Sequence, residues 1–218
     1  MKLSLMSAPR GKRPSQDRGH RRVQLLLDAA ADLILVHGAE GLKMDMVAKK
    51  AATSPGSLYQ FFPNRAVLLT ALMERYSEEI VDLGASIVRR QQEAPPSSMI
   101  EAARAFLLPF LDFYARNRAY VILSEASDRV FAGQGHHFSE DGSVARAMAD
   151  VLDPFVSAGA RDRLDRVCRM IAVVAHAAIA ASYDLSEEDR TLWLLELERL
   201  LQSYISTLQD AKVGAGTS

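Results

Sequence analysis

The sequence from Val23 to Arg65 reads VQLLLDAAADLILVHGAEGLKMDMVAKKAATSPGSLYQFFPNR, and it predicts three short helices. The first helix has one face whose residues recur at three- and four-residue steps, as an amphipathic helix requires. The residues on this face are Val23, Leu26, Leu27, Ala30, Leu33, Ile34 and His37. Gly38 and Gly41 are expected to end the helix, because glycine tolerates the left-handed geometry of a helix end.

Two shorter helices follow within the same stretch. Apolar residues on one side predict a helix of about two turns from Met44 to Ala51. Ser54 is placed as the N-cap of the next helix, with Pro55 at its first position. Helices this short bury too little surface alone, so they must pack against the first one. Two short helices that cross at a tight turn form a helix-turn-helix, here at about residues 43–62.

The charge is divided unevenly along the chain. Residues 1–65 carry 11 Lys and Arg against 5 Asp and Glu, a net charge of +6, whereas residues 66–218 carry 15 against 22, a net charge of −7. This asymmetry is typical of an amino-terminal nucleic-acid reader joined to an acidic body. Residues 1–20 are expected to form a disordered basic arm. The arm could follow DNA phosphates or act only as a solubilising tail, and both readings stay open.

The composition indicates a globular protein in a reducing compartment. Cys168 is the only cysteine, which excludes an internal disulfide framework. The longest apolar run, from Met170 to Ala181, has 12 residues, which is too short to span a bilayer. The amino terminus lacks the apolar segment of a secretory signal. We therefore expect a cytoplasmic protein with no membrane partner.

No group of residues predicts catalysis or a bound metal. No acid pair, Ser/His/Asp set, phosphate loop or CxxC motif stands in a setting that suggests an enzyme. His136 and His137, each followed four residues on by Glu140 or Asp141, have helical ligand spacing, but the glycines just before them indicate a loop. We therefore predict no catalytic residue, no metal and no cofactor.

Several motifs in the amino-terminal stretch resemble one family. They are an A-x-x-L motif late in the first helix, a glycine at the break, Val47-Ala48, and the run S-P-G-S-L-Y-Q-F-F-P-N-R followed by L-L. Together they resemble the DNA-binding domain of TetR-family transcriptional regulators, over about 50 of the 218 residues. The resemblance implies an all-α fold of about nine helices, with a three-helix DNA-binding domain at residues 21–66 and a regulatory and dimerisation domain at residues 67–210.

The expected DNA contacts lie in or beside the third helix, where short polar groups can reach base edges or phosphates. These residues are Lys43, Ser54, Pro55, Gly56, Ser57, Tyr59, Gln60, Asn64 and Arg65. The resemblance implies that Tyr59 and Arg65 hold phosphates, and Asn64 is expected to cap a fourth helix. Three residues depart from the family pattern. Lys43 replaces a capping hydroxyl, and Ala52 replaces the turn glycine, which implies a less permissive turn or some strain. Phe61 stands where the family often has histidine.

The middle of the chain is rich in aromatic residues. They could line an apolar pocket for a small-molecule effector or simply form the core, and the residues alone favour the core. The resemblance raises the expectation of a pocket without identifying its ligand. The candidate lining residues are Met73, Tyr76, Phe106, Phe110, Phe113, Tyr114, Tyr120 and His176.

The last two predicted helices, at about residues 163–185 and 187–208, are apolar over more than one face. This is more apolar surface than packing on a core requires, so a twofold interface of four helices is expected to bury the surplus. Ser186 is expected to cap the final helix. The predicted interface residues are Val167, Ile171, Val174, Ala178, Trp193, Leu197, Leu200, Leu201 and Tyr204.

These features together predict a sequence-specific DNA-binding transcriptional regulator. The resemblance implies a ligand-responsive repressor that binds a palindromic double-stranded DNA operator as a homodimer. Two alternatives stay open. One is an enzyme or carrier with a helical ligand pocket, and the other is a protein that associates with DNA without sequence preference.

Overall fold

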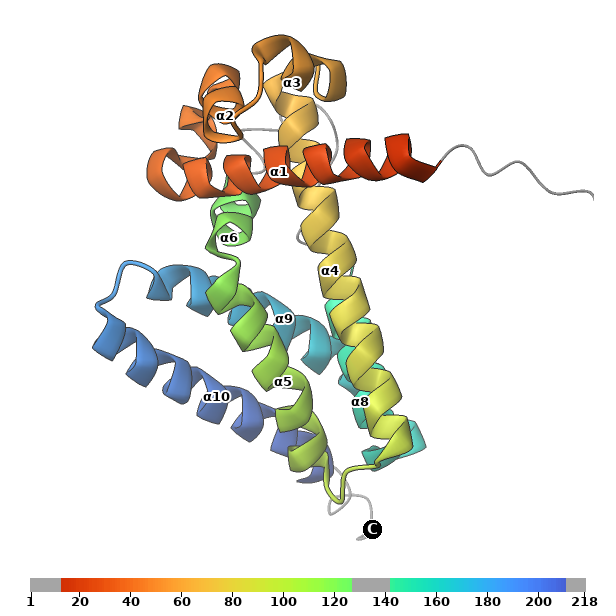
Figure 1. Ribbon diagram of the computed structural model, residues 1–218. Helices are drawn as coiled ribbons and strands as arrows, with labels where there is room; N and C mark the ends of the chain where they lie inside the picture. The colour runs from red at the N-terminus through yellow and green to blue at the C-terminus, as the bar shows by residue number, and fades with distance from the viewer. Residues whose placement is uncertain (1–12, 127–141, 211–218) are drawn as a thin grey trace, which may run out of the picture.

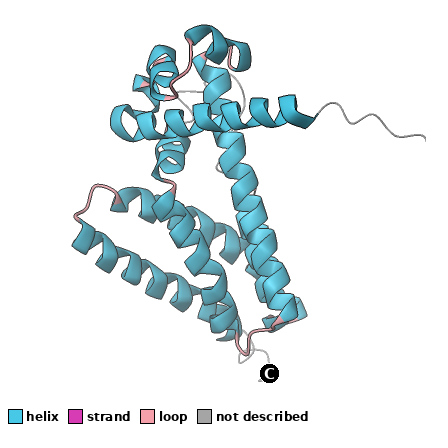
Figure 2. Ribbon diagram, in the orientation of Figure 1, coloured by secondary structure: helices cyan, strands magenta, loops and turns pink. Residues whose placement is uncertain are grey.

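The computed structural model describes residues 13–126 and 142–210. Within these residues the fold consists of nine α-helices and two short 3-10 turns, without strands (Figures 1 and 2). The prediction of an all-α fold is confirmed. The helices form an amino-terminal head above a larger helical body, and one long helix runs through both (Figure 1).

The head contains α1 (Arg13–Gly41), α2 (Met44–Lys50) and α3 (Pro55–Phe61). Gly38 interrupts α1 with a φ of 68°, a left-handed conformation that glycine adopts without steric cost. The buried side chains that join the three helices include Leu26, Ile34, Val47 and Leu58. Because α1 begins at Arg13, residues 13–20 are helical, and the expectation of disorder up to residue 20 is wrong for them. Residues 1–12 of the predicted arm lie outside the described residues.

Helix α4 (Arg65–Glu93) connects the head to the body. Leu68, Leu69 and Leu72 near its start and Ile80 and Ile87 further on are all buried, so the helix belongs to the core of both parts. Its upper part packs against α1 and its lower part against α5 and α8.

The body is made of the remaining helices and the two 3-10 turns. They are α5 (Met99–Arg116), α6 (Arg118–Glu125), α8 (Ser143–Leu152), the turns Asp153–Phe155 and Ala158–Ala160, α9 (Arg161–Ser182) and α10 (Glu187–Asp210). Helix α6 contacts α1 as well as α4, α5 and α9, so the body touches the head at a second place besides α4. Ser186 caps α10 as predicted, because its Oγ accepts from the backbone N–H of Asp189 at 3.1 Å.

Candidate nucleic-acid interface and cavity

Helix α3 is held in place by a cap and by its buried side. The Oγ of Ser54 accepts from the backbone N–H of Ser57 at 3.2 Å, which confirms Ser54 as N-cap. Leu58 is fully buried and anchors the helix, while Tyr59 and Gln60 are exposed. Tyr59 keeps 45% of its surface accessible. The polar side of α3 is therefore presented to solvent by a fixed backbone.

The turn between α2 and α3 contains the strain that the sequence predicted. Ala52 has a φ of 49°, and it is the one non-glycine residue with positive φ in the described part of the chain. The turn is held by hydrogen bonds from the backbone N–H of Thr53 to the carbonyl of Ala48 at 2.9 Å and from that of Ala52 to the carbonyl of Lys49 at 3.2 Å. A left-handed backbone costs an alanine roughly 1–2 kcal/mol.

Three exposed basic side chains of the head lie on or beside α1 and α2, the helices next to α3. Lys43 stands before α2 without a side-chain capping bond, and Lys49 at the end of α2 is likewise exposed. Arg22 on α1 donates to the Oγ of Ser57 at 3.3 Å, which brings a guanidinium to the start of α3. The motif does not single out Arg22, because the contact depends on how α1 crosses α3. Phosphate groups would meet this positive surface first.

The residues at the start of α4 divide between two roles. The Oδ1 of Asn64 accepts from the backbone N–H of Val67 at 3.0 Å, which confirms Asn64 as N-cap. Arg65 instead donates through one guanidinium nitrogen to the carbonyl oxygens of Glu40 at 2.5 Å and Ala39 at 3.4 Å. This fastens the end of α1 to α4. A phosphate contact by Arg65 stays a prediction, since its guanidinium already has internal partners.

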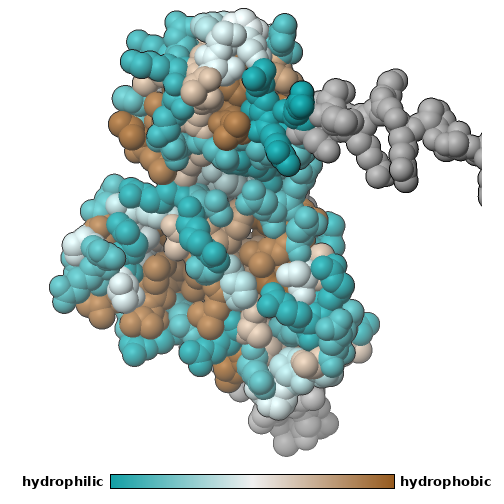
Figure 3. Space-filling view, viewed as in Figure 1, coloured by the Kyte–Doolittle hydropathy of each residue, from teal (hydrophilic) through white to brown (hydrophobic). Residues whose placement is uncertain are grey.

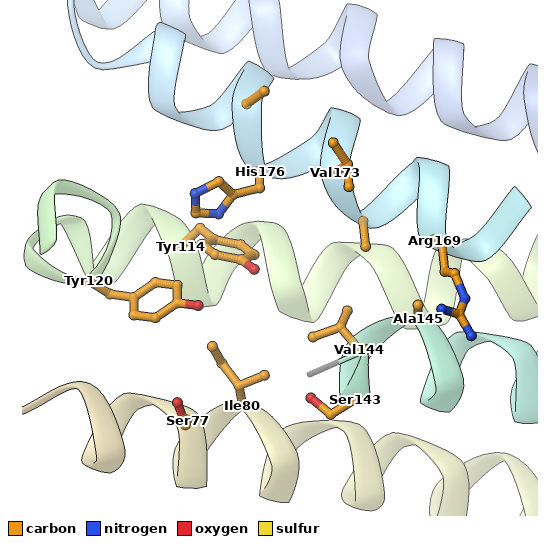
Figure 4. A pocket seen from close by; sticks show the side chains of 13 residues that line it. Ser77, Ile80, Tyr114, Tyr120, Ser143, Val144, Ala145, Arg169, Val173 and His176 are labelled. Atoms are coloured by element: carbon orange, nitrogen blue, oxygen red, sulfur yellow. The ribbon is translucent and has the colours of Figure 1, made fainter. Parts of the chain in front are cut away.

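A cavity of about 460 Å³ lies in the body between α4, α5, α6, α8 and α9 (Figure 4). Tyr114, Tyr120 and His176 line it, as predicted. The five other predicted lining residues do not: Met73, Tyr76, Phe106, Phe110 and Phe113 are buried in the core. Among them, Phe106 and Phe110 stack on each other with ring centroids 4.7 Å apart, and Tyr76 and Phe113 pack edge-on against Tyr120.

The lining also includes residues that the aromatic pattern did not identify, among them Ser77, Ile80, Arg169 and Val173. A signal for two of them was present in the sequence. Arg169, Val173 and His176 recur at four- and three-residue steps, so they share one side of α9.

His176 lies at the end of the cavity nearest α6. Burial lowers its pKa below the ordinary value, and the charge of Glu125 partly offsets this effect. Its Nε2 lies 3.2 Å from the Oγ of Ser124, a buried residue of α6. Burial also raises the pKa of the Tyr114 phenol. Both groups are therefore held uncharged at neutral pH.

The residues predicted to form the dimer interface differ in burial: some are buried within the single chain and others are exposed. Val167, Ile171, Leu197 and Leu201 are buried within the single chain, because α9 and α10 pack on each other and on the other body helices. Placing these four at an interface with a second chain is therefore wrong. Val174 and Ala178 are partly buried. Trp193, Leu200 and Tyr204 are exposed, together with Met170, Val173, Leu192 and Leu195, which the prediction omitted.

Six of these exposed side chains, all except the cavity-lining Val173, form what we call the apolar face, on α9 and α10. Apolar surface gathers over the α10 side of the body in Figure 3. In the described ranges, no helix is long and apolar enough to cross a membrane. The same ranges contain no cluster of histidine, cysteine and acidic side chains suited to a metal ion, and the predicted loop with His136 and His137 lies outside them.

Comparison with known proteins matches the head to one family. The model of bacterial regulatory proteins of the tetR family matches residues 26–72, which include the helix-turn-helix. No curated protein sequence gave a significant match. The structural comparisons extend the likeness to the body.

Solved structures of similar fold cover most of this chain. A TetR-family transcriptional regulator from Mesorhizobium loti matches with a TM-score of 0.63 and 14% identity, over 89% of this chain and 98% of that one. A γ-butyrolactone receptor matches with a TM-score of 0.57 and 18% identity, over 89% and 99%. The regulator FadR from Bacillus subtilis, in complex with stearoyl-CoA, matches with a TM-score of 0.52 and 14% identity, over 89% and 99%.

At these identities the solved structures establish the fold. Residues 26–72 match the DNA-binding domain of tetR-family regulatory proteins, and the described helices have the fold of solved TetR-family transcriptional regulators.

Proposed function

We propose that the protein is a ligand-responsive repressor that acts as a homodimer on a palindromic operator in the cytoplasm. The observation that carries this proposal is that two helices, α4 and α6, both line the cavity and contact α1 of the head. A ligand that changes the position of either helix would move the DNA-binding surface. Such a ligand acts only if its affinity differs between the DNA-bound and released states.

A continuous set of contacts supports this coupling. Tyr120, in the cavity wall, meets the ring of Tyr76 edge-on with centroids 5.5 Å apart. The guanidinium of Arg75 lies 5.3 Å from the centroid of the Tyr76 ring. Arg75 also donates to the carboxylate of Asp28 at 2.6 Å and to the side chain of Gln24 at 3.3 Å, both on α1. A shift of Tyr120 would thus reach α1 through packed side chains.

The apolar face supports the homodimer. Trp193 is 43% exposed, yet its Nε1–H donates to the carbonyl of Ala178 at 2.9 Å. The exposed part of the indole is therefore apolar, with its polar group already satisfied, as suits an interface anchor. Leu192, Leu200 and Met170 are also exposed on the same two helices, and a second copy of this face would cover the apolar surface.

In the proposed dimer each α3 enters a major groove of the operator. Tyr59 and Gln60 would reach base edges or phosphates, while Lys43 and Arg22 would contact phosphates. Two proteins of similar fold fit a ligand-responsive role, one named a receptor for γ-butyrolactone and the other bound to stearoyl-CoA. Repression follows if the operator overlaps a promoter, because the bound dimer would exclude polymerase.

The test uses DNA from upstream of the protein's own coding sequence. We expect binding at one site with a Kd of about 10 nM or tighter in physiological salt. Gln60→Ala should weaken binding or change the sequence preference, and the matched control Gln92→Ala, at the exposed far end of α4, should do neither. Equal, weak binding to all DNA would favour the nonspecific alternative, and transcription that rises on adding the protein would contradict repression.

A further inference from the structure

The polar groups of the cavity are gathered at two separate ends (Figure 4). Arg169 and His176 both belong to α9 and are seven residues apart, hence about 10 Å along the helix axis. Between them the lining is apolar, with Val173 on α9, Ile80 on α4 and Val144 on α8. The cavity therefore suits an elongated molecule with an apolar middle.

The His176 end offers a hydrogen-bond acceptor. The Oγ of Ser124 lies 2.8 Å from the carbonyl of Val121 and 3.2 Å from the Nε2 of His176. Because Ser124 has one proton, we assign it to the shorter bond, so Nε2 carries a proton and donates to Ser124. Nδ1 is then an acceptor, and no hydrogen bond joins it to any of the described residues.

Two phenols complete this end of the cavity. The rings of Tyr114 and Tyr120 lie edge-on to the imidazole, with centroids 5.9 and 6.3 Å from it. Figure 4 shows both hydroxyl groups directed into the space between α4 and α9. A hydroxyl or N–H group of a ligand could donate to Nδ1 and meet these phenols.

The Arg169 end offers a positive charge. Neither an ion pair nor a hydrogen bond joins the guanidinium to another described residue. The lining residues that the structure describes include no Asp or Glu, so Arg169 is the charged group among them. The start of α8, with Ser143 and Val144 in the lining, adds partial charge of the same sign.

We propose that the effector is a small amphipathic acid. Its carboxylate pairs with Arg169, its apolar part fills the space beside Ile80 and Val173, and a hydroxyl or N–H group donates to Nδ1 of His176. This inference rests on the proposed function in one respect, that the cavity is an effector site. It adds the chemical class of the ligand and argues against cationic ligands, which would place a positive charge beside Arg169 where the described lining residues supply no opposing acid.

The test is isothermal calorimetry on the full chain without DNA, with probes below their micellar concentrations. The probes are ω-hydroxydecanoate, decanoate, decanol and decyltrimethylammonium. We expect ω-hydroxydecanoate to bind most tightly and the quaternary ammonium probe to bind least. Arg169→Gln should weaken decanoate binding by about tenfold and leave decanol unchanged, because it removes a charge-assisted hydrogen bond.

Two further variants make the result specific. Arg166→Gln, an exposed arginine of α9 outside the cavity lining, is the matched control and should leave decanoate binding unchanged. His176→Phe should abolish the advantage of ω-hydroxydecanoate over decanoate. The inference is overturned if the ammonium probe binds as tightly as decanoate, or if Arg169→Gln and Arg166→Gln bind decanoate alike.

A DNA-release assay distinguishes this inference from the proposed function. Release by a ligand of another class would overturn only this inference, and binding of the acids without release would overturn only the responsive role.

Discussion

The exposed side of α3 and the apolar face of α9 and α10 are both open to solvent, but they are built from opposite chemistry. Around α3 the exposed groups are hydroxyls, an amide and the cations of Lys43, Lys49 and Arg22. On α9 and α10 they are large apolar side chains, represented by Trp193 and Leu200.

The difference indicates two kinds of partner. A polar, cationic surface gains little by burial and much by meeting phosphates, so its affinity depends on salt. An apolar surface gains by being removed from water, at about 25 cal/mol per Å². We infer that the head is built for DNA and the apolar face for a second protein chain.

The largest expected effect is on stability, and it should differ between alanine substitutions of two neighbouring leucines of α10. Leu201 is 1% exposed and Leu200 is 56% exposed. Leu201→Ala should lower the free energy of unfolding by about 2–5 kcal/mol, because it leaves a cavity in the core. Leu200→Ala should instead change how the melting temperature varies with protein concentration, compared with the wild type, because it weakens the association of two chains. Chemical denaturation and melting across a concentration series distinguish these outcomes. Equal loss of stability in both variants would remove the distinction between core and interface.

On the head, Tyr59→Ala is expected to weaken operator binding by about 1 kcal/mol or more at each half-site, because the phenol contacts DNA in the proposed complex. Tyr59→Phe removes the hydroxyl alone and should weaken operator binding by less than Tyr59→Ala does. The thermal stability of both variants should stay near that of the wild type, since the residue is half exposed. Anisotropy titrations at two salt concentrations provide the measurement. Unchanged affinity for Tyr59→Ala would remove α3 as the reading surface.

The head could be predicted more fully than the body, and the reason is locality. Caps such as Ser54 and Asn64 act within one helical turn, so their residue types and spacing were sufficient. The hydrogen-bond partners of Arg65 and Arg22 could not be predicted from local residue types and spacing, because both contacts join residues far apart in the sequence.

In the body, α9 and α10 were predicted as helices, but their rotation about their own axes was not. Sequence periodicity identified α9 and α10 as apolar on several sides, but it cannot say which side meets α5 and α8 and which meets solvent. Leu197 and Leu201 were therefore assigned to the dimer interface, although they are buried within the single chain. The same uncertainty assigned Phe106 and Phe113 to the cavity, although their rings fill the core.

A smaller effect is expected at the turn that presents α3. Ala52→Gly should raise the free energy of unfolding by roughly 0.5–1 kcal/mol, because glycine adopts the positive φ of 49° without steric cost. The adjacent Ala51 has a φ of −78°, so Ala51→Gly should lower stability and is the matched control. Urea denaturation measures both variants. A loss of stability in Ala52→Gly would show that the turn is not strained at this residue.

The smallest effect concerns the cavity and pH. The pKa of His176 is lowered in the folded chain, from an ordinary value of 6.5, mainly by burial. The folded state therefore binds fewer protons than the unfolded state. The stability that His176 contributes is present above pH 6.5 and is lost as the pH falls below it. The free energy of unfolding should fall by less than about 1.4 kcal/mol per pH unit. His176→Gln should reduce this slope, whereas His37→Gln, on the exposed side of α1, should keep it. Equal slopes in both variants would contradict burial of a neutral imidazole.

Sedimentation of the full chain, alone and on operator DNA, tests the central claim that the apolar face joins two chains whose heads read one operator. We predict two copies, or a higher even number, in the wild-type complex, and single copies with weakened DNA binding for Leu200→Asp. One chain bound to the operator at full affinity, in the wild type or in Leu200→Asp, would contradict the account.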